Sequence, residues 1–418
     1  MKIAVLGGSF DPVHSGHLFL ADSVISKLGY DRVVFVPAFR SPFKLDASGM
    51  EESAGLRLRM IASSIAGDPG LFVDDCEIRR GGVSYTVDTL ADIAARYAPE
   101  GKPGLVIGDD LIPDFPDWHR SGEILDLADV IVACRTGKEH PKPAFPCTMM
   151  DNDIMEISSS TVRQRIASGG AWRYLIPPAA AAVIEEKGLY GCKSGSPGIP
   201  GLCGIWPEGK PLKNIIAKVE TAALENLSFD RFLHSRGTAM LAGDLCRRFS
   251  LNPDLGYLAG IVHDLAKQLG GSAQIELAKK YPKQVSDLEK EKPSLLHGWA
   301  AAVLLKEHFG VCNSEVLEAV ALHTFGGLEM GPVAKAVYIA DKAEPSREKI
   351  DPALRKLVFC GKDLDAIFFR VLEKAVASLN SRKLKLSQET LALYEKLKSG
   401  KAAAAFPERE NRGGTDAG

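Results

Sequence analysis

The sequence of 418 residues lacks the features that mark three classes of protein. Its eight cysteines form no Cys-x-x-Cys pair and no regular spacing, which argues against a disulfide framework and predicts reduced thiols in the cytoplasm. No apolar run reaches the roughly twenty residues needed to cross a membrane, and Ile3 to Leu6 read as a strand of the fold instead of a signal peptide. The net charge is only -2, with both signs interspersed, so no basic field for nucleic acid is expected.

The length suggests two domains, and glycine and proline mark the boundary between them. Before the boundary, apolar runs alternate with helical patterns, which predicts an α/β fold with a doubly wound parallel sheet. After it the spacing of apolar residues is that of helices throughout, which predicts an all-α domain. We therefore expect an α/β domain at residues 1–190, a linker at 191–212, a helical domain at 213–398 and a disordered tail at 399–418.

The first twenty residues predict a site for a nucleoside triphosphate. A buried strand at Ile3 to Leu6 leads into Gly7-Gly8, which we expect to form a turn that brings backbone N–H groups close to an anion. A helix is expected to begin near Gly16, and its N-terminal end favours phosphate. His14 and His17 are three residues apart and therefore share one face of its first turn.

This segment, GGSFDPVHSGHL, resembles the HxGH signature of the nucleotidyltransferase superfamily, and further segments resemble the nicotinate mononucleotide adenylyltransferases. Ile157 to Arg163 resembles the superfamily's ISSTxIR signature. Val36 to Lys44 resembles a PxxxxPxHK loop, although Phe43 replaces its histidine. The resemblance implies an acceptor site for nicotinate mononucleotide formed by Lys44, Tyr85, Thr86, Asp109 and Trp118. The sequence leaves the acceptor open: another phosphorylated compound, such as pantetheine phosphate, is an alternative. It also does not decide between nicotinate and nicotinamide mononucleotide.

Adenylyl transfer asks a phosphate oxygen of the acceptor to attack the α-phosphorus of ATP and expel pyrophosphate. Because a phosphate monoester is mostly ionised near neutral pH, the protein must align the reactants and neutralise growing charge, and needs no general base. The residues suited to this role are His14, His17, Lys44 and Arg163. We expect Mg²⁺ to accompany ATP, with further ATP contacts from Gly7, Gly8, Ser9, Phe10, Ile157, Ser158 and Ser159.

The second domain carries an ordered set of imidazoles and carboxylates. Each member lies in a run compatible with a helix, and side chains of this kind projecting inward from several helices suit first-row metals. The set consists of His234, His263, Asp264, His297, His323 and Asp341. It resembles the ligand pattern of HD-domain phosphohydrolases, and six ligands suffice for two metal ions.

Two further segments, LHTFG and YIADKAEPSR, resemble a bacterial HD family that cleaves diadenosine tetraphosphate symmetrically to two ADP. The resemblance implies a dinuclear iron site, with manganese as the alternative, in which Asp264 bridges the ions. His234, His263 and Asp341 would complete one ion, and His297 and His323 the other. Lys267 and Arg347 are candidates for phosphate contacts, and Lys267 for catalysis.

Two questions stay open at this stage. A nucleotide-binding regulatory module with structural metals is an alternative for the helical domain. The sequence is also compatible with a homo-oligomer, and it does not decide the oligomeric state.

Overall fold

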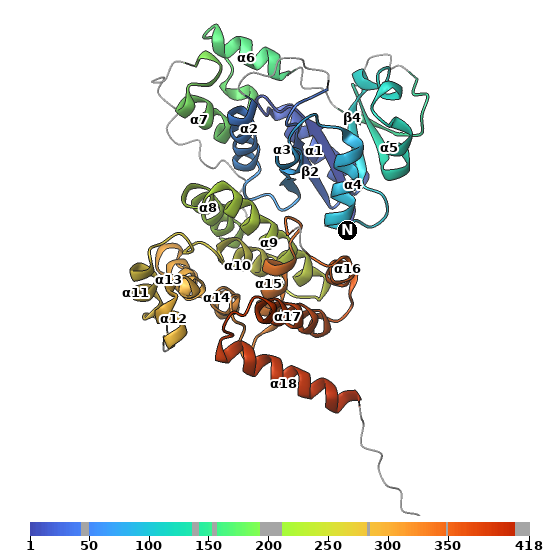
Figure 1. Cartoon of the computed structure of the whole chain (residues 1–418). Coiled ribbons are helices and arrows are strands. Elements are labelled where there is room, and N and C mark those ends of the chain that lie inside the picture. Colours follow the sequence, from blue (N-terminus) through green and yellow to red (C-terminus); the bar gives the residue numbers. More distant parts are fainter. Residues whose placement is uncertain are drawn as a thin grey trace, which may run out of the picture. The chain divides into compact units, whose positions relative to one another are not determined.

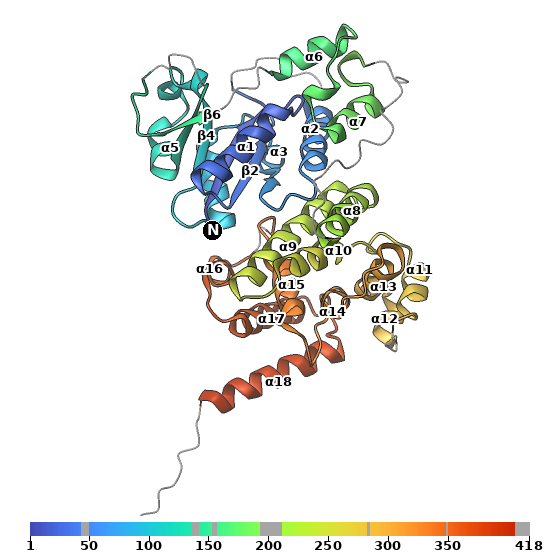
Figure 2. The ribbon, with the colours of Figure 1, turned by 180° about the vertical axis from the view of Figure 1, so that it is seen from behind.

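The computed structural model describes residues 1–42, 50–135, 142–152, 157–192, 211–281, 285–347 and 350–405. The chain divides into two compact units, Met1–Leu224 and Glu225–Gly418 (Figures 1 and 2). The first is an α/β unit and the second is helical, so the predicted fold class is confirmed.

A parallel sheet of six strands forms the centre of the first unit. The strands are β1 (Ile3–Gly8), β2 (Arg32–Pro37), β3 (Leu71–Val73), β4 (Gly104–Gly108), β5 (Asp129–Arg135) and β6 (Thr148–Asn152). Their order across the sheet is β3-β2-β1-β4-β5-β6, so the chain reverses direction across the sheet between β1 and β4. In sheets of this kind ligands bind beyond the carboxyl ends of the strands at this reversal.

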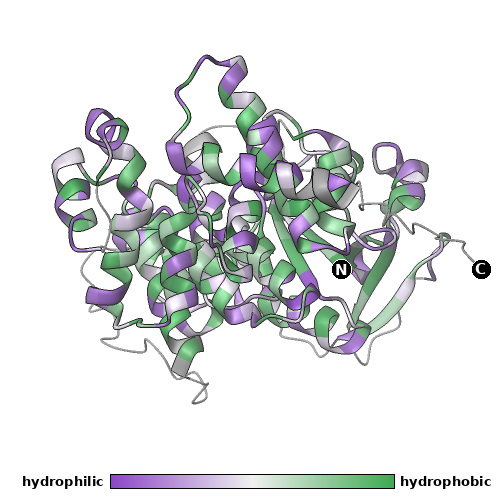
Figure 3. Cartoon of the chain, turned by 90° about the horizontal axis from the view of Figure 1, so that it is seen from below, coloured by the Kyte–Doolittle hydropathy of each residue, from purple (hydrophilic) through white to green (hydrophobic). Residues whose placement is uncertain are grey.

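The helices of the first unit pack around the sheet, except for α8, which lies away from it (Figure 1). They are α1 (Ser15–Leu28), α2 (Met50–Ser64), α3 (Cys76–Arg80), α4 (Thr86–Tyr97), α5 (Ser121–Leu127), α6 (Ser159–Ala167), α7 (Pro178–Lys187) and α8 (Pro211–Asn226). Short 3-10 helices are η1 (Asp109–Leu111), η2 (Phe115–Asp117), η3 (Arg173–Leu175) and η4 (Leu189–Gly191). Because helices cover the sheet, the central strands consist mainly of hydrophobic residues, such as residues 3–6 of β1 and 33–36 of β2, and hydrophobic residues are green in Figure 3.

The described part of the second unit consists of helices and their connections. These are α9 (Phe229–Arg248), α10 (Pro253–Val262), α11 (Gly271–Ala278), α12 (Asp287–Glu291), η5 (Pro293–Leu296), α13 (His297–Phe309), α14 (Ser314–Leu322), α15 (Pro332–Ala343), α16 (Pro352–Cys360), α17 (Leu364–Ser381) and α18 (Gln388–Ala405). Across the described ranges of the chain, every helix is too short or too polar to span a lipid bilayer. The seven cysteines in these ranges are free thiols.

The boundary between the two units differs from the predicted domain limits. The second unit begins at Glu225, within α8, whereas the sequence suggested residue 213. Glu220 of α8 is fully buried, and its carboxylate accepts a hydrogen bond of 2.7 Å from the Gly67 backbone N–H, which ties α8 to the first unit. Of the predicted linker, residues 193–210 lie outside the described residues. Helix α18 runs seven residues into the predicted tail, to Ala405, and residues 406–418 are also outside the description.

Strand β6 cannot be predicted from its own sequence, because it lacks the apolar run that marks the other strands. In its sequence, TMMDN, only Met150 is buried, since the strand lies at the edge of the sheet. Its parallel pairing with β5 defines it, and that pairing depends on residues distant in the sequence.

Candidate active sites

The two histidines of the first unit stand beyond the carboxyl end of β1, next to the reversal between β1 and β4. His14 is the N-cap residue of α1, and His17 lies one turn into the helix. Their rings stack with centroids 3.6 Å apart, as expected from a spacing of three residues. The backbone N–H of His14 donates to Nδ1 of His17 at 3.1 Å. Because Nδ1 accepts, the neutral His17 ring carries its proton on Nε2 and can donate there.

Burial keeps both rings neutral. Desolvation lowers the pKa of His14 to about 4. Desolvation, and then the proximity of His14, holds the pKa of His17 well below its usual range. Nδ1 of His14 is buried and has no hydrogen-bond partner. The pair therefore presents neutral hydrogen-bonding groups to whatever binds at the end of β1.

The expected Gly7-Gly8 turn is wrong. Both residues belong to β1, and neither has a positive φ. The positive φ, 45°, belongs to Phe10, whose buried ring packs on His17 at a centroid distance of 4.9 Å. A Cβ at Gly7 would meet no atom within 4 Å, whereas one at Gly8 would come within 3.2 Å of the Phe10 ring. Open space beside the backbone is thus provided at Gly7.

The segment 157–163 contacts the loop of residues 9–12, which connects β1 to α1. Ile157 stands two residues before α6, and Ser158 is the N-cap, with Oγ accepting the Thr161 N–H at 3.1 Å. The Ser159 hydroxyl donates to the Pro12 carbonyl at 2.9 Å, and Arg163 Nη1 donates to the Asp11 carbonyl at 2.6 Å. The structure therefore brings the two sequence signatures together around residues 9–12.

The described residues expected to bind the acceptor lie at the start of α4 and after β4. Tyr85 is the N-cap of α4 and Thr86 its first residue, so backbone N–H groups are available at this helix start. Asp109 follows β4 directly and is buried, and Trp118 follows η2. The neighbouring Ser84 hydroxyl accepts the Phe39 N–H at 3.0 Å, which ties the segment that leads into α4 to the loop after β2. Lys44 lies outside the described residues.

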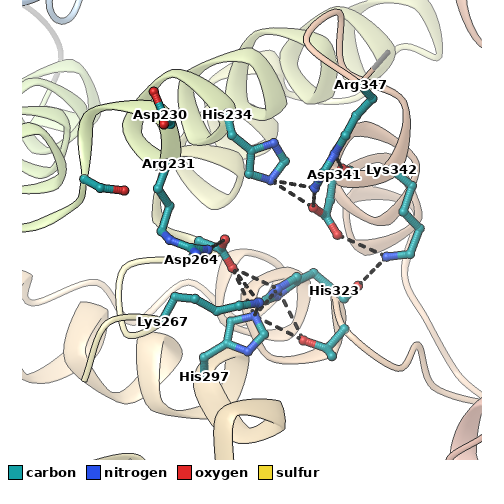
Figure 4. Close-up of a pocket in the computed structure, with 12 residues that line it drawn as sticks. Asp230, Arg231, His234, Asp264, Lys267, His297, His323, Asp341, Lys342 and Arg347 are labelled. Carbon is teal, nitrogen blue, oxygen red and sulfur yellow. Dashed lines mark hydrogen bonds and ion pairs between the residues drawn. The ribbon is translucent and has the colours of Figure 1, made fainter. Parts of the chain in front are cut away.

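In the second unit, five of the six predicted ligands line one cavity of about 580 Å³ (Figure 4). The sixth, His263, lies beside them, with Nε2 3.7 Å from Oδ1 of Asp264 and 3.6 Å from Oδ1 of Asp341. His234 comes from α9, Asp341 from α15, and the others from positions at helix ends. The expectation that each lies within a helix is wrong for three of them, because His263 and Asp264 follow the last residue of α10 and His323 follows that of α14. Helix α10 ends at Val262, so Lys267 lies beyond it.

These positions give the histidines a common anchor. Nδ1 of His263 donates to the Gly260 carbonyl, and Nδ1 of His323 to the Val320 carbonyl, both at 2.7 Å. His297, the first residue of α13, bonds the Ser294 carbonyl in the same way at 2.7 Å. A carbonyl can only accept, so each Nδ1 carries the proton and each Nε2 presents a lone pair to the cavity.

The arrangement of these lone pairs fits divalent metal ions. Two groups have ligand atoms that all lie within 4.8 Å of one another: His234, His263 and Asp341, and His263, Asp264 and His323. Nε2 of His263 is buried without a hydrogen-bond partner. Nε2 of His297 and Nε2 of His323 lie 2.9 Å apart, and burial lowers the pKa of both rings. The lone pairs of two unprotonated nitrogens this close repel each other, and a cation beside them relieves the repulsion. Lys267 Nζ, 3.0 Å from Nε2 of His297, is one such cation, and a metal ion bound to both nitrogens would act in the same way.

The carboxylates remain ionised in this buried setting. Burial alone would raise the pKa of Asp264, but His263, His297 and Lys267 hold it well below its usual range. Burial alone would also raise the pKa of Asp341, but Lys342, His234 and His263 hold it well below its usual range. His234 differs from the other rings, because hydrogen bonds to Asp341 and Glu344 outweigh burial and raise its pKa to about 9.

Four basic side chains line the cavity beside the ligands. Arg231 Nη1 lies 2.8 Å from Oδ2 of Asp264, and Lys267 Nζ lies 3.0 Å from Nε2 of His297. Across the cavity, Lys342 Nζ and Arg347 Nη2 each lie 3.1 Å from a carboxylate oxygen of Asp341 (Figure 4). The sequence predictions included Lys267 and Arg347 but missed Arg231 and Lys342, which stand three residues before His234 and directly after Asp341.

The comparisons with known proteins agree with this division. Residues 5–165 match the cytidylyltransferase-like family, and residues 231–346 match the HD domain. A protein of Treponema pallidum named "Probable nicotinate-nucleotide adenylyltransferase" is 41% identical over 207 residues, which cover 46% of this chain and 99% of that protein. A protein of Borreliella afzelii with the same name is 38% identical over 190 residues, covering 46% of this chain and 97% of that protein. The chain belongs to this adenylyltransferase family.

The adenylyltransferase relatives match less than half of the chain, and the HD match lies in the other part. A crystal structure from Clostridium acetobutylicum, described as a predicted HD superfamily hydrolase involved in NAD metabolism, is 29% identical and covers 44% of this chain and 96% of its own, with a TM-score of 0.41. The chain thus joins a nicotinate-nucleotide adenylyltransferase-like domain to an HD domain.

Proposed function

We propose that the first unit transfers AMP from ATP to nicotinate mononucleotide, giving deamido-NAD and pyrophosphate. The observation that carries this proposal is the meeting of His14, His17 and Arg163 around one loop at the carboxyl end of β1. The names of the adenylyltransferase relatives support the same reaction.

The chain's own residues supply alignment and charge neutralisation in this reaction. The phosphate of the acceptor is ionised near neutral pH, so attack needs no general base. His17 would donate from Nε2 to oxygen atoms of the ATP α-phosphate, and Arg163 would add a fixed positive charge beside them. Lys44 is proposed to join them. Mg²⁺ would be held mainly by triphosphate oxygens and water, which asks for few protein ligands.

The acceptor would lie beside the start of α4. Backbone N–H groups at Tyr85 and Thr86 suit the nicotinate carboxylate, and Trp118 could stack on the pyridine ring. Incubating the purified chain with ATP, Mg²⁺ and nicotinate mononucleotide should give deamido-NAD, separated by chromatography. Parallel reactions with nicotinamide mononucleotide and pantetheine phosphate test the acceptor. Faster transfer to either one would overturn the proposed specificity.

We propose that the HD unit is a metal-dependent phosphohydrolase that cleaves diadenosine tetraphosphate to two ADP. The carrying observation is a cavity lined by five metal-ligand side chains and four basic ones, with the sixth ligand, His263, beside Asp264 and Asp341. Two divalent ions, iron or manganese, would be held by His234, His263, Asp264, His297, His323 and Asp341. When bound, such ions polarise phosphoryl oxygens and activate water.

The basic side chains would hold the phosphate chain across these ligands. Arg231 and Lys267 stand on the Asp264 side, and Lys342 and Arg347 on the Asp341 side. Cations on both sides suit a substrate with phosphates on both sides of the bond that breaks. Lys267, within 3.4 Å of Asp264, is proposed to contact the reacting phosphate.

The test is hydrolysis of diadenosine tetraphosphate by chain loaded separately with iron and with manganese. Two ADP as the products would support symmetrical cleavage, whereas AMP and ATP would overturn it. Metal removal that unfolds the domain, in a protein whose loaded form releases no product from any nucleotide offered, would favour a regulatory module.

A further inference from the structure

The loop from Ser9 to Pro12 joins β1 to the residue that caps α1, and side chains from three separate elements hold it. Arg57 of α2 donates from Nη1 to the Ser9 carbonyl at 2.7 Å. From α6, Ser159 and Arg163 bond the Pro12 and Asp11 carbonyls. The remaining contact comes from η4, far away in the sequence. There the Tyr190 hydroxyl donates to Oδ1 of Asp11 at 2.6 Å.

Tyr190 makes this contact from an unusual backbone conformation. Its φ of 57° and ψ of 26° lie in the left-handed region, which a tyrosine rarely adopts. Such a conformation persists only where surrounding contacts maintain it. Burial, and then the hydrogen bond to Asp11, raises the pKa of Tyr190, so the phenol keeps its proton and remains the donor.

Asp11 connects Tyr190 to the phosphate-binding groups. Its carbonyl accepts from Arg163 Nη1 at 2.6 Å, and its Oδ2 lies 3.8 Å from the same nitrogen. The other terminal nitrogen of Arg163 lies 3.3 Å from Oγ of Ser160. A change in the orientation of Asp11 would therefore move the Arg163 guanidinium and the backbone that leads to His14.

We propose that Tyr190 is a positioning residue for adenylyl transfer, acting through Asp11 on the placement of Arg163. This role rests on the proposed function of the first unit. Tyr190 itself contacts a carboxylate of the chain and is assigned no contact with substrate. Its hydroxyl group, more than its ring, carries the role, because the hydroxyl makes the bond to Asp11.

The test is Tyr190→Phe in the full chain, which keeps the ring and removes the bond. Loss of a hydrogen bond to a charged group predicts a fall in kcat of about 10- to 100-fold for deamido-NAD formation. The KM values for ATP and nicotinate mononucleotide should change much less, because the misplaced group acts mainly in the transition state. Tyr174→Phe is the matched control, since Tyr174 is 79% exposed, and it should keep the wild-type kcat.

A double-mutant cycle separates positioning from a folding defect. In an Asp11→Ala background, Tyr190→Phe should cause little further loss, because the group through which it acts is already gone. A folding defect would reduce activity by the same factor in both backgrounds. That additive result, or a wild-type kcat in Tyr190→Phe, overturns the role of Tyr190. A wild-type chain that makes no deamido-NAD overturns the proposed function itself, and the positioning role falls with it.

Discussion

Nδ1 of His234 lies 3.0 Å from Oε1 of Glu344, while Nε2 of the same ring lies 3.1 Å from Oδ1 of Asp341. Glu344 is 1% exposed, and its carboxylate also accepts the Ser346 backbone N–H at 2.7 Å. The ring of His234 is thus the one imidazole of the ligand set that a carboxylate orients, where backbone carbonyls orient His263, His297 and His323.

We therefore predict that Glu344→Ala weakens metal binding by the HD unit. Partners of this kind typically change metal affinity by about 10- to 100-fold. Competition with a chelator, followed by elemental analysis, measures the effect. Glu329→Ala, which removes an exposed carboxylate paired with Lys396, is the control and should bind metal as the wild type does. Equal metal affinity in the wild type and Glu344→Ala would show that His234 needs no such support.

Asp264→Ala should remove metal and phosphohydrolase activity together. Oδ1 of Asp264 lies 3.0 Å from Nε2 of His297 and 3.7 Å from Nε2 of His263, so one carboxylate serves both sides of the ligand set. Elemental analysis and hydrolysis of diadenosine tetraphosphate are measured on the same preparation. Asp365→Ala, which removes an exposed carboxylate paired with Lys335, is the control. Full metal content with normal turnover in Asp264→Ala would make this aspartate structural.

His17→Ala should lower kcat for adenylyl transfer by about 10²- to 10³-fold, the usual cost of losing a donor to developing charge. Hydrolysis by the HD unit of the same chain should stay unchanged. Asp22→Ala, on the exposed side of α1, controls for effects on the helix. Steady-state kinetics of the three proteins decide the matter, and near wild-type turnover in His17→Ala would remove this ring from the proposed mechanism.

Local features of the sequence predicted the fold class and much of each candidate site. The strand at Ile3 to Leu6 can be predicted because its four residues are all apolar, and in the structure they are at most 5% exposed. The histidine pair can be predicted because a helix brings residues three apart together. The turn at Gly7-Gly8 failed because a glycine pair permits a turn without requiring one. Phe10 adopts the left-handed conformation instead, where its ring packs against His17 and Phe35.

The residues that were missed act through contacts between distant parts of the chain. Arg57 contacts a residue 48 positions away, Glu344 one 110 positions away and Tyr190 one 179 positions away. No periodicity or short motif encodes such distances. Glu344 had a partial signal, since it stands in the ADKAEPSR segment, but its role becomes visible only when His234 is placed beside it.

A buried ion pair between Asp74 and Arg96 should make the stability of the first unit depend on pH. Burial alone would raise the pKa of Asp74, yet the ion pair with Arg96 and a hydrogen bond from Tyr97 lower it to about 2. A depressed carboxyl pKa stabilises the fold above the unfolded value near 3.8, and this stability is lost as the pH falls towards 2. Asp74→Asn should therefore lower the free energy of unfolding at pH 7 and flatten its decline below pH 4. Denaturant unfolding at several pH values checks this, and an undiminished decline in the variant would contradict it.

The stability of the β1 to α1 region should fall in an earlier window, between about pH 6.5 and 4. The pKa of His14 is about 4 in the folded chain and 6.5 in a free side chain. Between these pH values the unfolded chain binds a proton at His14 and the folded chain does not. Stability is complete above pH 6.5 and decreases as the pH falls to about 4, by up to roughly 3 kcal/mol for this ring alone. His17 shifts in the same direction. Hydrogen exchange of peptides covering residues 3–28, corrected for the intrinsic pH dependence of exchange, measures the local free energy of opening. His14→Gln should retain protection across this window better than the wild type does. An equal fall in both proteins would show that other groups control the acid sensitivity of this region.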